Sequence, residues 1–176
     1  LEDLRNIPCP VVGESEQATP QEGSPGYGLL QRLFDQLAQA RCLTLLREGP
    51  LGAGGVNEVL MGLLHGRLDP GFSPGLFAGL PVMATANDHA RRVYNGDTGV
   101  LVDWAGGRRA VFRRGRNFLL LPVGALTGLE PAFAMTVHKS QGSEYGSVLL
   151  VLPDRENQLL SRELVYTALT RAKTSA

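Results

Sequence analysis

Two stretches of the chain carry polar side chains at the point where an apolar pattern ends. Residues 134–144 predict a buried strand that runs into a tight turn containing Gly142. Residues 163–173 predict an amphipathic helix with Thr170 and Arg171 near its end. Turns that follow the strands of a parallel sheet are where α/β proteins bind their ligands. Together, the two stretches predict a site that handles phosphate.

Length and composition suit a globular chain. With 176 residues, 43% of them hydrophobic, it can bury the core of one medium-sized domain that carries a small insertion. The 17 basic residues balance the 17 acidic ones, which excludes a whole-molecule field that attracts nucleic acid or membranes. Any attraction to phosphate must therefore come from local patches.

Cysteine and histidine usage indicates neither a metal site nor a disulfide. Cys9 and Cys42 lack metal or redox spacing, so we expect a loop thiol and a buried thiol in a reducing compartment. The three histidines are scattered. Without a signal peptide or an apolar run of spanning length, the chain is expected to be cytoplasmic. It begins without Met and stops soon after residue 173, so we expect a piece of a longer protein.

Periodicity predicts an α/β domain that is interrupted once. Residues 1–26 are rich in Pro, Gly, Glu, Gln and Ser and are expected to be irregular. Residues 27–78 and 132–176 alternate helices with buried strands and predict one layered sheet domain. The expected elements are helix 27–40, strand 42–46, helix 56–64, strand 132–137, a short helix at 138–142, strand 147–152 and helix 162–173, for which Ser161 is the N-cap and Glu163 lies in the first turn.

The segment between these parts, residues 79–131, predicts an all-β insertion. Short apolar runs alternate with Gly turns at close spacing, which is typical of a small antiparallel barrel or sandwich. The expected strands are 81–86, 98–104, 109–113 and 118–121, with turns at 95–96 and 105–107.

Several side chains in the first stretch suit phosphate chemistry. Thr136 can cap the following helix, whose free N–H groups, with Lys139, can hold a phosphate. Gly142 permits close approach of another backbone, and Glu144 can accept a hydrogen bond from a ribose hydroxyl. The structural alternative is a capped helix start with solvated polar groups, and it stays open for each residue taken singly.

The residues also resemble those of a known family. Thr-Val-His-Lys-Ser-Gln-Gly-Ser-Glu (136–144) resembles motif V of RecD-like superfamily 1 DNA helicases, and Leu-Val-Tyr-Thr-Ala-Leu-Thr-Arg-Ala-Lys (164–173) resembles their motif VI. The order and separation of the motifs also match. Residues 46–52 with Asn57 resemble the start of the same motor domain, and residues 79–100 resemble its SH3-like insertion. The resemblance covers about residues 41–173 and implies an α/β fold, namely a RecA-like second motor domain (2A) with an incomplete parallel sheet, plus a small SH3-like β-barrel insertion (2B).

The resemblance implies a role for each matching residue. Arg171 matches the arginine finger that reaches the γ-phosphate of the nucleotide; from the residues alone it is a charge favourable to a helix C-terminus. Tyr166 and Thr167, one turn earlier, are expected to support it. The other matching residues are Gly142 and Glu144 near the nucleotide sugar, Thr136 and His138 facing the DNA backbone, and Lys139 near either ligand.

The chain lacks the phosphate-binding and Mg²⁺-binding motifs of the family. It contains no Gly-x-x-x-x-Gly-Lys-[Ser/Thr] loop and no acidic motif for Mg²⁺. We therefore expect half of an ATP site, with ATP and Mg²⁺ bound only in the full-length enzyme and no ATP hydrolysis by this chain alone. The resemblance implies a 5′ to 3′ helicase of the exonuclease V type. Its implied partners are single-stranded DNA, the N-terminal motor domain of the same polypeptide and other subunits of an exonuclease V complex.

A basic run suggests a further DNA contact. Arg113 and Arg114 are the expected phosphate ligands, and the interleaved aromatic residues are candidates for stacking on a base. The full run is Arg108, Arg109, Arg113, Arg114 and Arg116, interleaved with Trp104, Phe112 and Phe118. The alternative is a solvated hairpin whose aromatic residues face the barrel core. For the whole chain, the alternatives are a non-catalytic binding module with an SH3-like barrel, or a relaxase-linked or Pif1-like helicase.

Overall fold

The computed structural model describes residues 20–68, 75–104, 107–155 and 158–176, with side chains omitted at 65–68. The chain forms two compact units. The described residues up to Phe34 and from Gly75 to Ala132 make the β unit, and the remainder make the α/β unit. No helix of the described residues is long and apolar enough to cross a membrane.

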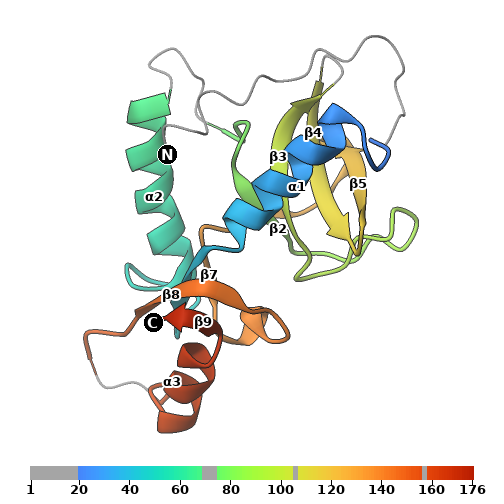
Figure 1. Ribbon diagram of the computed structural model, residues 1–176. Helices are drawn as coiled ribbons and strands as arrows, with labels where there is room; N and C mark the ends of the chain where they lie inside the picture. The colour runs from blue at the N-terminus through green and yellow to red at the C-terminus, as the bar shows by residue number, and fades with distance from the viewer. Residues whose placement is uncertain (1–19, 69–74, 105–106, 156–157) are drawn as a thin grey trace. The chain divides into compact units, whose positions relative to one another are not determined.

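The α/β unit is built on a four-stranded sheet in which all strands are parallel, as the sequence predicts. The strand order is β7-β1-β8-β9. Figure 1 shows α2 on one side of this sheet and α3 on the other. The elements are β1 (Ala40–Thr44), α2 (Ala53–Leu68), β7 (Ala134–Thr136), a 3₁₀ turn η3 (His138–Ser140), β8 (Tyr145–Val151), α3 (Arg162–Leu169) and β9 (Ala172–Ser175).

The core of the α/β unit lies between the sheet and α3. Leu43 and Leu45 are almost fully buried there, and Ala168 reaches them from the helix. Burial of each leucine stabilises the fold by about 1.5–3 kcal/mol. The rest of the cluster is Met135, Val137, Tyr145 and Val148, with Leu150, Leu164, Val165 and Ala172 packed at its edge.

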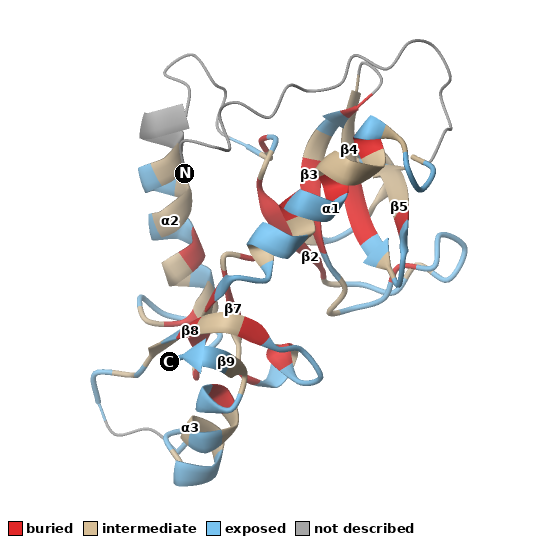
Figure 2. Ribbon diagram, viewed as in Figure 1, coloured by how far each residue is buried: buried red, intermediate tan, exposed pale blue. Residues whose placement is uncertain are grey.

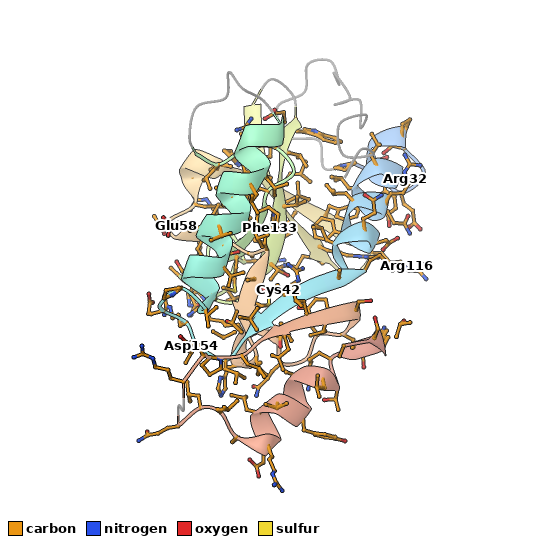
Figure 3. All side chains as sticks on the ribbon, turned by 90° about the vertical axis from the view of Figure 1, so that its left-hand side faces the viewer. Arg32, Cys42, Glu58, Arg116, Phe133 and Asp154 are labelled. Carbon is orange, nitrogen blue, oxygen red and sulfur yellow. The ribbon has the colours of Figure 1, made fainter. Side chains whose placement is uncertain are left out.

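Alternate residues of β1 point to the opposite face of the sheet. Cys42 lies opposite Ala134 on β7 and Leu149 on β8 (Figure 3). The thiol is free and half-buried, so it is less enclosed than the buried thiol expected from the sequence. Burial raises its pKa. Cys9 lies outside the described residues.

A side chain of α2 completes the outer edge of the sheet. The Asn57 amide donates to the carbonyl of Ala134 at 2.9 Å and accepts from the N–H of Ala134 at 2.8 Å. These are the two bonds that a neighbouring strand would make, and Asn57 is buried while making them. Asn57 thereby fixes the start of the strand that leads into motif V.

The last helix is shorter than the sequence predicts. The hydroxyl of Ser161 accepts from the N–H of Leu164 at 3.2 Å, so the expected N-cap is confirmed. The pKa of the Glu163 carboxyl is lowered, first by a hydrogen bond from the backbone N–H of Glu163 and then by one from the Ser161 hydroxyl. The helix ends at Leu169 rather than at 173, because Ala172–Ser175 pairs with β8 as a strand. A periodic sequence cannot reveal this competing pairing.

The β unit contains a five-stranded antiparallel sheet. The order is β5-β4-β3-β2-β6. The elements are β2 (Pro81–Ala84), β3 (Thr98–Trp104), β4 (Gly107–Arg114), β5 (Asn117–Pro122), a 3₁₀ turn η2 (Val123–Ala125) and β6 (Leu129–Pro131). The sequence did not predict β6, which has three residues and carries Pro131 at its end. Of the turn expected at 105–107, residues 105–106 lie outside the described residues.

Helix α1 (Pro25–Leu37) packs on the β unit through its first part. The Tyr27 ring meets Phe118 edge-on with centroids 5.3 Å apart, and Phe34 lies 5.5 Å from the same ring. Gly26 touches Trp104 so closely that a Cβ would lie 2.5 Å from the indole ring. Figure 2 shows buried residues on β2, β3 and β4. The sequence grouped residues 27–40 with the α/β part, whereas the structure groups residues up to Phe34 with the β unit.

Candidate functional site

The turn after β7 is held by its own hydrogen bonds. The Thr136 hydroxyl accepts from the N–H of Lys139 at 3.3 Å, although the N-cap position of the 3₁₀ turn is Val137 rather than the expected Thr136. The hydroxyl of Ser140 is buried and donates to the carbonyl of Val137 at 2.7 Å. These bonds fix the backbone, while His138 remains exposed and Lys139 is half-buried. The turn therefore presents its cationic and imidazole groups from a rigid frame.

Gly142 is needed for its backbone conformation. Its φ of 81° lies in the left-handed region, where other residues are strained. A Cβ at this position would meet no other atom of the described residues within 4 Å. Close approach of another backbone, the reason expected from the sequence, is thus not what the described residues show. The neighbouring Gln141, Ser143 and Glu144 are exposed, so the turn is accessible.

The structure brings Arg171 to this turn. Its carbonyl accepts from the N–H of Tyr145 at 2.8 Å, and its own N–H donates to Ala168 at the end of α3. The guanidinium donates to the Thr167 carbonyl through Nε and to the Ser143 carbonyl through Nη1, both at 3.4 Å. The sequence predicts Arg171 within the last helix, but α3 ends at Leu169. Arg171 instead connects the end of α3 to the turn at Ser143. Both side-chain bonds are long and therefore weak.

A second contact joins the two motifs. Lys173 Nζ lies 3.1 Å from Glu144 Oε2, and both side chains are 62% exposed. An exposed ion pair contributes only about 0–1 kcal/mol. Glu144, expected near a ribose hydroxyl, therefore has a lysine partner that a ligand can displace at low cost.

Sequence reasoning missed one buried charged residue, which contacts the side chain of Tyr145 directly after the turn. Arg41 is buried in β1, and its guanidinium carbon lies 5.1 Å from the ring centroid of Tyr145. Burial lowers the pKa of Arg41, an effect that the Tyr145 hydroxyl opposes. That hydroxyl also contacts the Met135 sulfur at 3.6 Å. The sequence signal that could have identified Arg41 is its position as a charged residue in a short, mostly apolar strand.

The Gly-rich loop before α2 is no substitute for a phosphate loop. The N–H groups of Gly52, Ala53 and Gly54 donate to the carbonyls of Gly49, Leu46 and Arg47 at 3.0–3.1 Å. Donors engaged in this way do not face a ligand. The absence of a Lys-Ser/Thr pair after the loop agrees with this geometry.

Arg113 and Arg114 lie in the β unit. Arg114 pairs with the Asp97 carboxylate and donates to the Arg92 carbonyl at 2.9 Å. Arg113 is exposed, and its Nε donates to the Gly115 carbonyl at 3.4 Å. The aromatic residues of the run are buried, at 8% exposure for Trp104, 0% for Phe112 and 3% for Phe118. The stacking hypothesis for these aromatic residues is therefore wrong, because they fill the core of the β unit.

The chain is similar to known helicase proteins over most of its length. A model of the UvrD-like helicase C-terminal domain matches residues 131–176, which include both stretches of the candidate site. The RecD subunit of the RecBCD enzyme from Mycolicibacterium smegmatis is 41% identical over 99% of the chain and 30% of its own length. The chain is RecD-like. The RecD subunit from Haemophilus influenzae is 35% identical over 98% of this RecD-like chain and 25% of its own length.

Other relatives extend the comparison. The ATP-dependent RecD2 DNA helicase of Deinococcus radiodurans is 36% identical over 88% of the RecD-like chain and 22% of its own length. The RecD-like chain thus spans 22–30% of the length of these three relatives. Among solved structures, the Pif1 helicase from Candida albicans aligns with a TM-score of 0.49 and 16% identity, covering 81% of this chain and 47% of that one. The predicted resemblance to RecD-like helicases is confirmed.

The described residues contain no group of three or more His, Cys, Asp or Glu side chains that could hold a metal ion.

Proposed function

We propose that this RecD-like chain is the C-terminal motor part of an ATP-dependent DNA helicase and supplies motifs V and VI to an ATP site completed by another domain. The observation that carries the proposal is the contact of Arg171 with the turn at Ser143 and Tyr145. Arg171, whose guanidinium can stabilise phosphate charge, is thereby attached to the turn that we propose contacts DNA.

Arg171 is the proposed arginine finger. Its guanidinium is permanently charged, planar and half-buried, and its two hydrogen bonds to the protein are long. Moving it from the Ser143 carbonyl to a γ-phosphate oxygen therefore exchanges a weak bond for a charge-assisted one. In such sites the arginine stabilises the charge that develops on the transferred phosphoryl group. Mg²⁺, when bound with ATP, neutralises phosphate charge, and its ligands belong to the other domain.

The rest of the turn connects nucleotide and DNA. Gly142 and Glu144 are the proposed neighbours of the nucleotide sugar, and Thr136 and His138 are the proposed contacts to the DNA backbone. Lys139 serves either ligand. The stretch from Thr136 to Glu144 is only nine residues long, and bonds at Thr136 and Ser140 stiffen it. A displacement at the nucleotide end is therefore carried to the DNA end rather than absorbed.

The two units have proposed identities. The α/β unit, with its parallel strands and helices on both faces, is a RecA-like motor domain. The β unit, with five short antiparallel strands, is an SH3-like barrel inserted within it, for which residues 79–131 are the proposed extent. Arg113 remains a proposed phosphate contact because it is exposed.

The partners follow from the same proposal. They are single-stranded DNA along which the motor moves 5′ to 3′, an N-terminal motor domain of the same polypeptide, and other subunits of an exonuclease V complex. Named relatives that are subunits of the RecBCD enzyme support the last of these.

DNA-stimulated ATP hydrolysis tests the proposal. The purified chain of residues 1–176 is expected to show none, because it contains no phosphate loop. The full-length polypeptide is expected to hydrolyse ATP and to be stimulated by single-stranded DNA. Turnover by residues 1–176 alone that disappears with Arg171→Ala would refute the division of the site between domains.

A further inference from the structure

An exposed loop of the β unit is built around a small backbone bridge. Residues 87–97 make up most of the connection between β2 and β3, and we call them the braced loop. The N–H of Asp88 donates to the Val93 carbonyl at 2.6 Å, and the N–H of Val93 returns a bond to Asp88 at 3.0 Å. Val93 is 1% exposed and anchors the loop in the core. The tip of the loop is therefore fixed at its base.

The backbone around Tyr94 is fixed as well. Its N–H donates to the Asp97 carboxylate at 2.7 Å, and its carbonyl accepts from the N–H of Asp97 at 2.9 Å. The next N–H, at Asn95, donates to the Asn87 side chain at 2.8 Å, and Gly96 donates to the Ala84 carbonyl. Such a loop loses little conformational freedom when it binds a ligand.

A strained residue at the tip is held by Arg114. Arg92 has a φ of 57°, which a non-glycine residue adopts only at a cost of about 1–2 kcal/mol. Its carbonyl accepts a hydrogen bond from Arg114, which also pairs with Asp97. Arg114, a predicted DNA contact, thus braces this loop.

The braced loop holds its aromatic residue in solvent. Tyr94 is 45% exposed, and the ring of the exposed His89 meets it edge-on with centroids 5.7 Å apart. The acidic residues nearby are neutralised, because Asp88 pairs with Arg91 at 2.8 Å and Asp97 with Arg114. Arg92 is exposed two residues from Tyr94 and has no ion pair among the described residues.

We propose that Tyr94, flanked by His89, is a stacking platform for a base of single-stranded nucleic acid, and that Arg92 contacts an adjacent phosphate. Base stacking on an aromatic ring beside a cation is how proteins hold single strands without reading their sequence. A single exposed ring among cations suits this ligand better than a protein partner, which would need a wider apolar patch. The choice of DNA as the strand rests on the proposed function.

Binding of an oligo(dT) to residues 1–176, measured by fluorescence anisotropy at two salt concentrations, tests the platform. Tyr94→Ala is expected to weaken binding by about 5- to 150-fold, which corresponds to about 1–3 kcal/mol per stacked base. Tyr94→Phe keeps the π-face and is expected to bind within about twofold of the parent. Arg92→Ala is expected to lower the salt slope by about 0.7, the value for one lost phosphate contact on a single strand. Arg32→Ala, an exposed arginine of α1, is the matched control.

An oligonucleotide with abasic sites separates stacking from other contacts. The parent is expected to bind it less tightly than oligo(dT), whereas Tyr94→Ala is expected to bind the two equally. Thermal unfolding of each variant verifies that the braced loop stays folded, and Tyr94→Phe keeps the test valid if Tyr94→Ala does not fold. A parent that binds both oligonucleotides equally, or no binding of oligo(dT) at low salt, would overturn the platform.

A His138→Ala variant distinguishes this inference from the proposed function. Weakened binding by His138→Ala with unchanged binding by Tyr94→Ala would overturn the platform and leave the motor assignment standing. Weakened binding by Tyr94→Ala with unchanged binding by His138→Ala would support the platform and count against the DNA role of motif V.

Discussion

The carbonyl oxygen of Arg171 accepts a hydrogen bond from the backbone N–H of Tyr145 at 2.8 Å. This bond joins the residue directly after the turn to a residue that follows α3, at the point where β8 and β9 begin to pair. Because it is a backbone bond, side-chain substitutions at either residue leave it in place. The position of the Arg171 main chain is thus set by the sheet, while its guanidinium is held only by two long bonds.

Glu144 and Lys173 allow a structural role to be separated from a ligand role. Exchanging the two charges, in Glu144→Lys with Lys173→Glu, is expected to change the free energy of unfolding by less than about 1 kcal/mol, since the pair is exposed. If Glu144 accepts from the nucleotide sugar, the same exchange is expected to raise the KM for ATP in the full-length polypeptide. Urea unfolding and steady-state kinetics measure the two effects. An unchanged KM would remove Glu144 from the nucleotide site.

Replacing Asn57 by Asp tests the amide that completes the sheet edge. A carboxylate can accept from the N–H of Ala134 but cannot donate to its carbonyl, whereas a protonated carboxyl can do both. Leaving that buried carbonyl unsatisfied is expected to cost about 1–3 kcal/mol. Burial also favours the neutral form, so the folded-state pKa of the new carboxyl is expected to lie above the unfolded value.

Because the folded-state pKa lies above the unfolded value, the Asn57→Asp variant is expected to lose stability as pH rises. The stability contributed by the protonated carboxyl is full below the unfolded pKa and is lost as pH rises through the higher folded pKa. The Asn57→Asp variant is therefore expected to lose more stability relative to the parent at pH 8 than at pH 5, in urea unfolding. Asn117→Asp, at an exposed position, is the control. A deficit that does not depend on pH would contradict the paired bonds at Ala134.

The carboxyl of Asp88 reports on the braced loop. The N–H of Arg91, and then its side chain, lower the pKa of Asp88 below its usual range. Stability from this arrangement is present above the unfolded pKa and is lost as pH falls through the lower folded pKa. In a carboxyl NMR titration, Arg91→Ala is expected to return the pKa only part of the way, because the backbone bond remains. A full return would assign the shift to the side chain alone.

Much of the fold follows from local pattern. The structure confirms strand 98–104 to the residue, and Ser161 caps the last helix as its chemistry indicates. Local pattern failed where a distant pairing decides the outcome. The helix expected to reach 173 stops at Leu169, because the residues after it gain bonds to β8.

In the candidate site too, local sequence predicts some features, whereas contacts between distant residues determine others. Residue types in motif V identified the turn, but nothing local revealed that Asn57 replaces a strand or that Arg41 lies beneath Tyr145. Aromatic residues interleaved with arginine suggested stacking, yet strand alternation places Phe112 in the core. An aromatic ring of the β unit that does lie in solvent is Tyr94, on a loop whose arrangement depends on Arg114 from a distant strand.

The central claim, that Arg171 acts on the nucleotide, is tested by DNA-stimulated ATP hydrolysis of the full-length polypeptide. Arg171→Ala is expected to reduce kcat by about 10³-fold or more, as loss of an arginine finger does. Arg171→Lys is also expected to be impaired because lysine lacks the planar fork, whereas Arg162→Ala, at the start of α3, is expected to resemble the parent. A kcat for Arg171→Ala within about tenfold of the parent would contradict the claim, because a finger contributes far more.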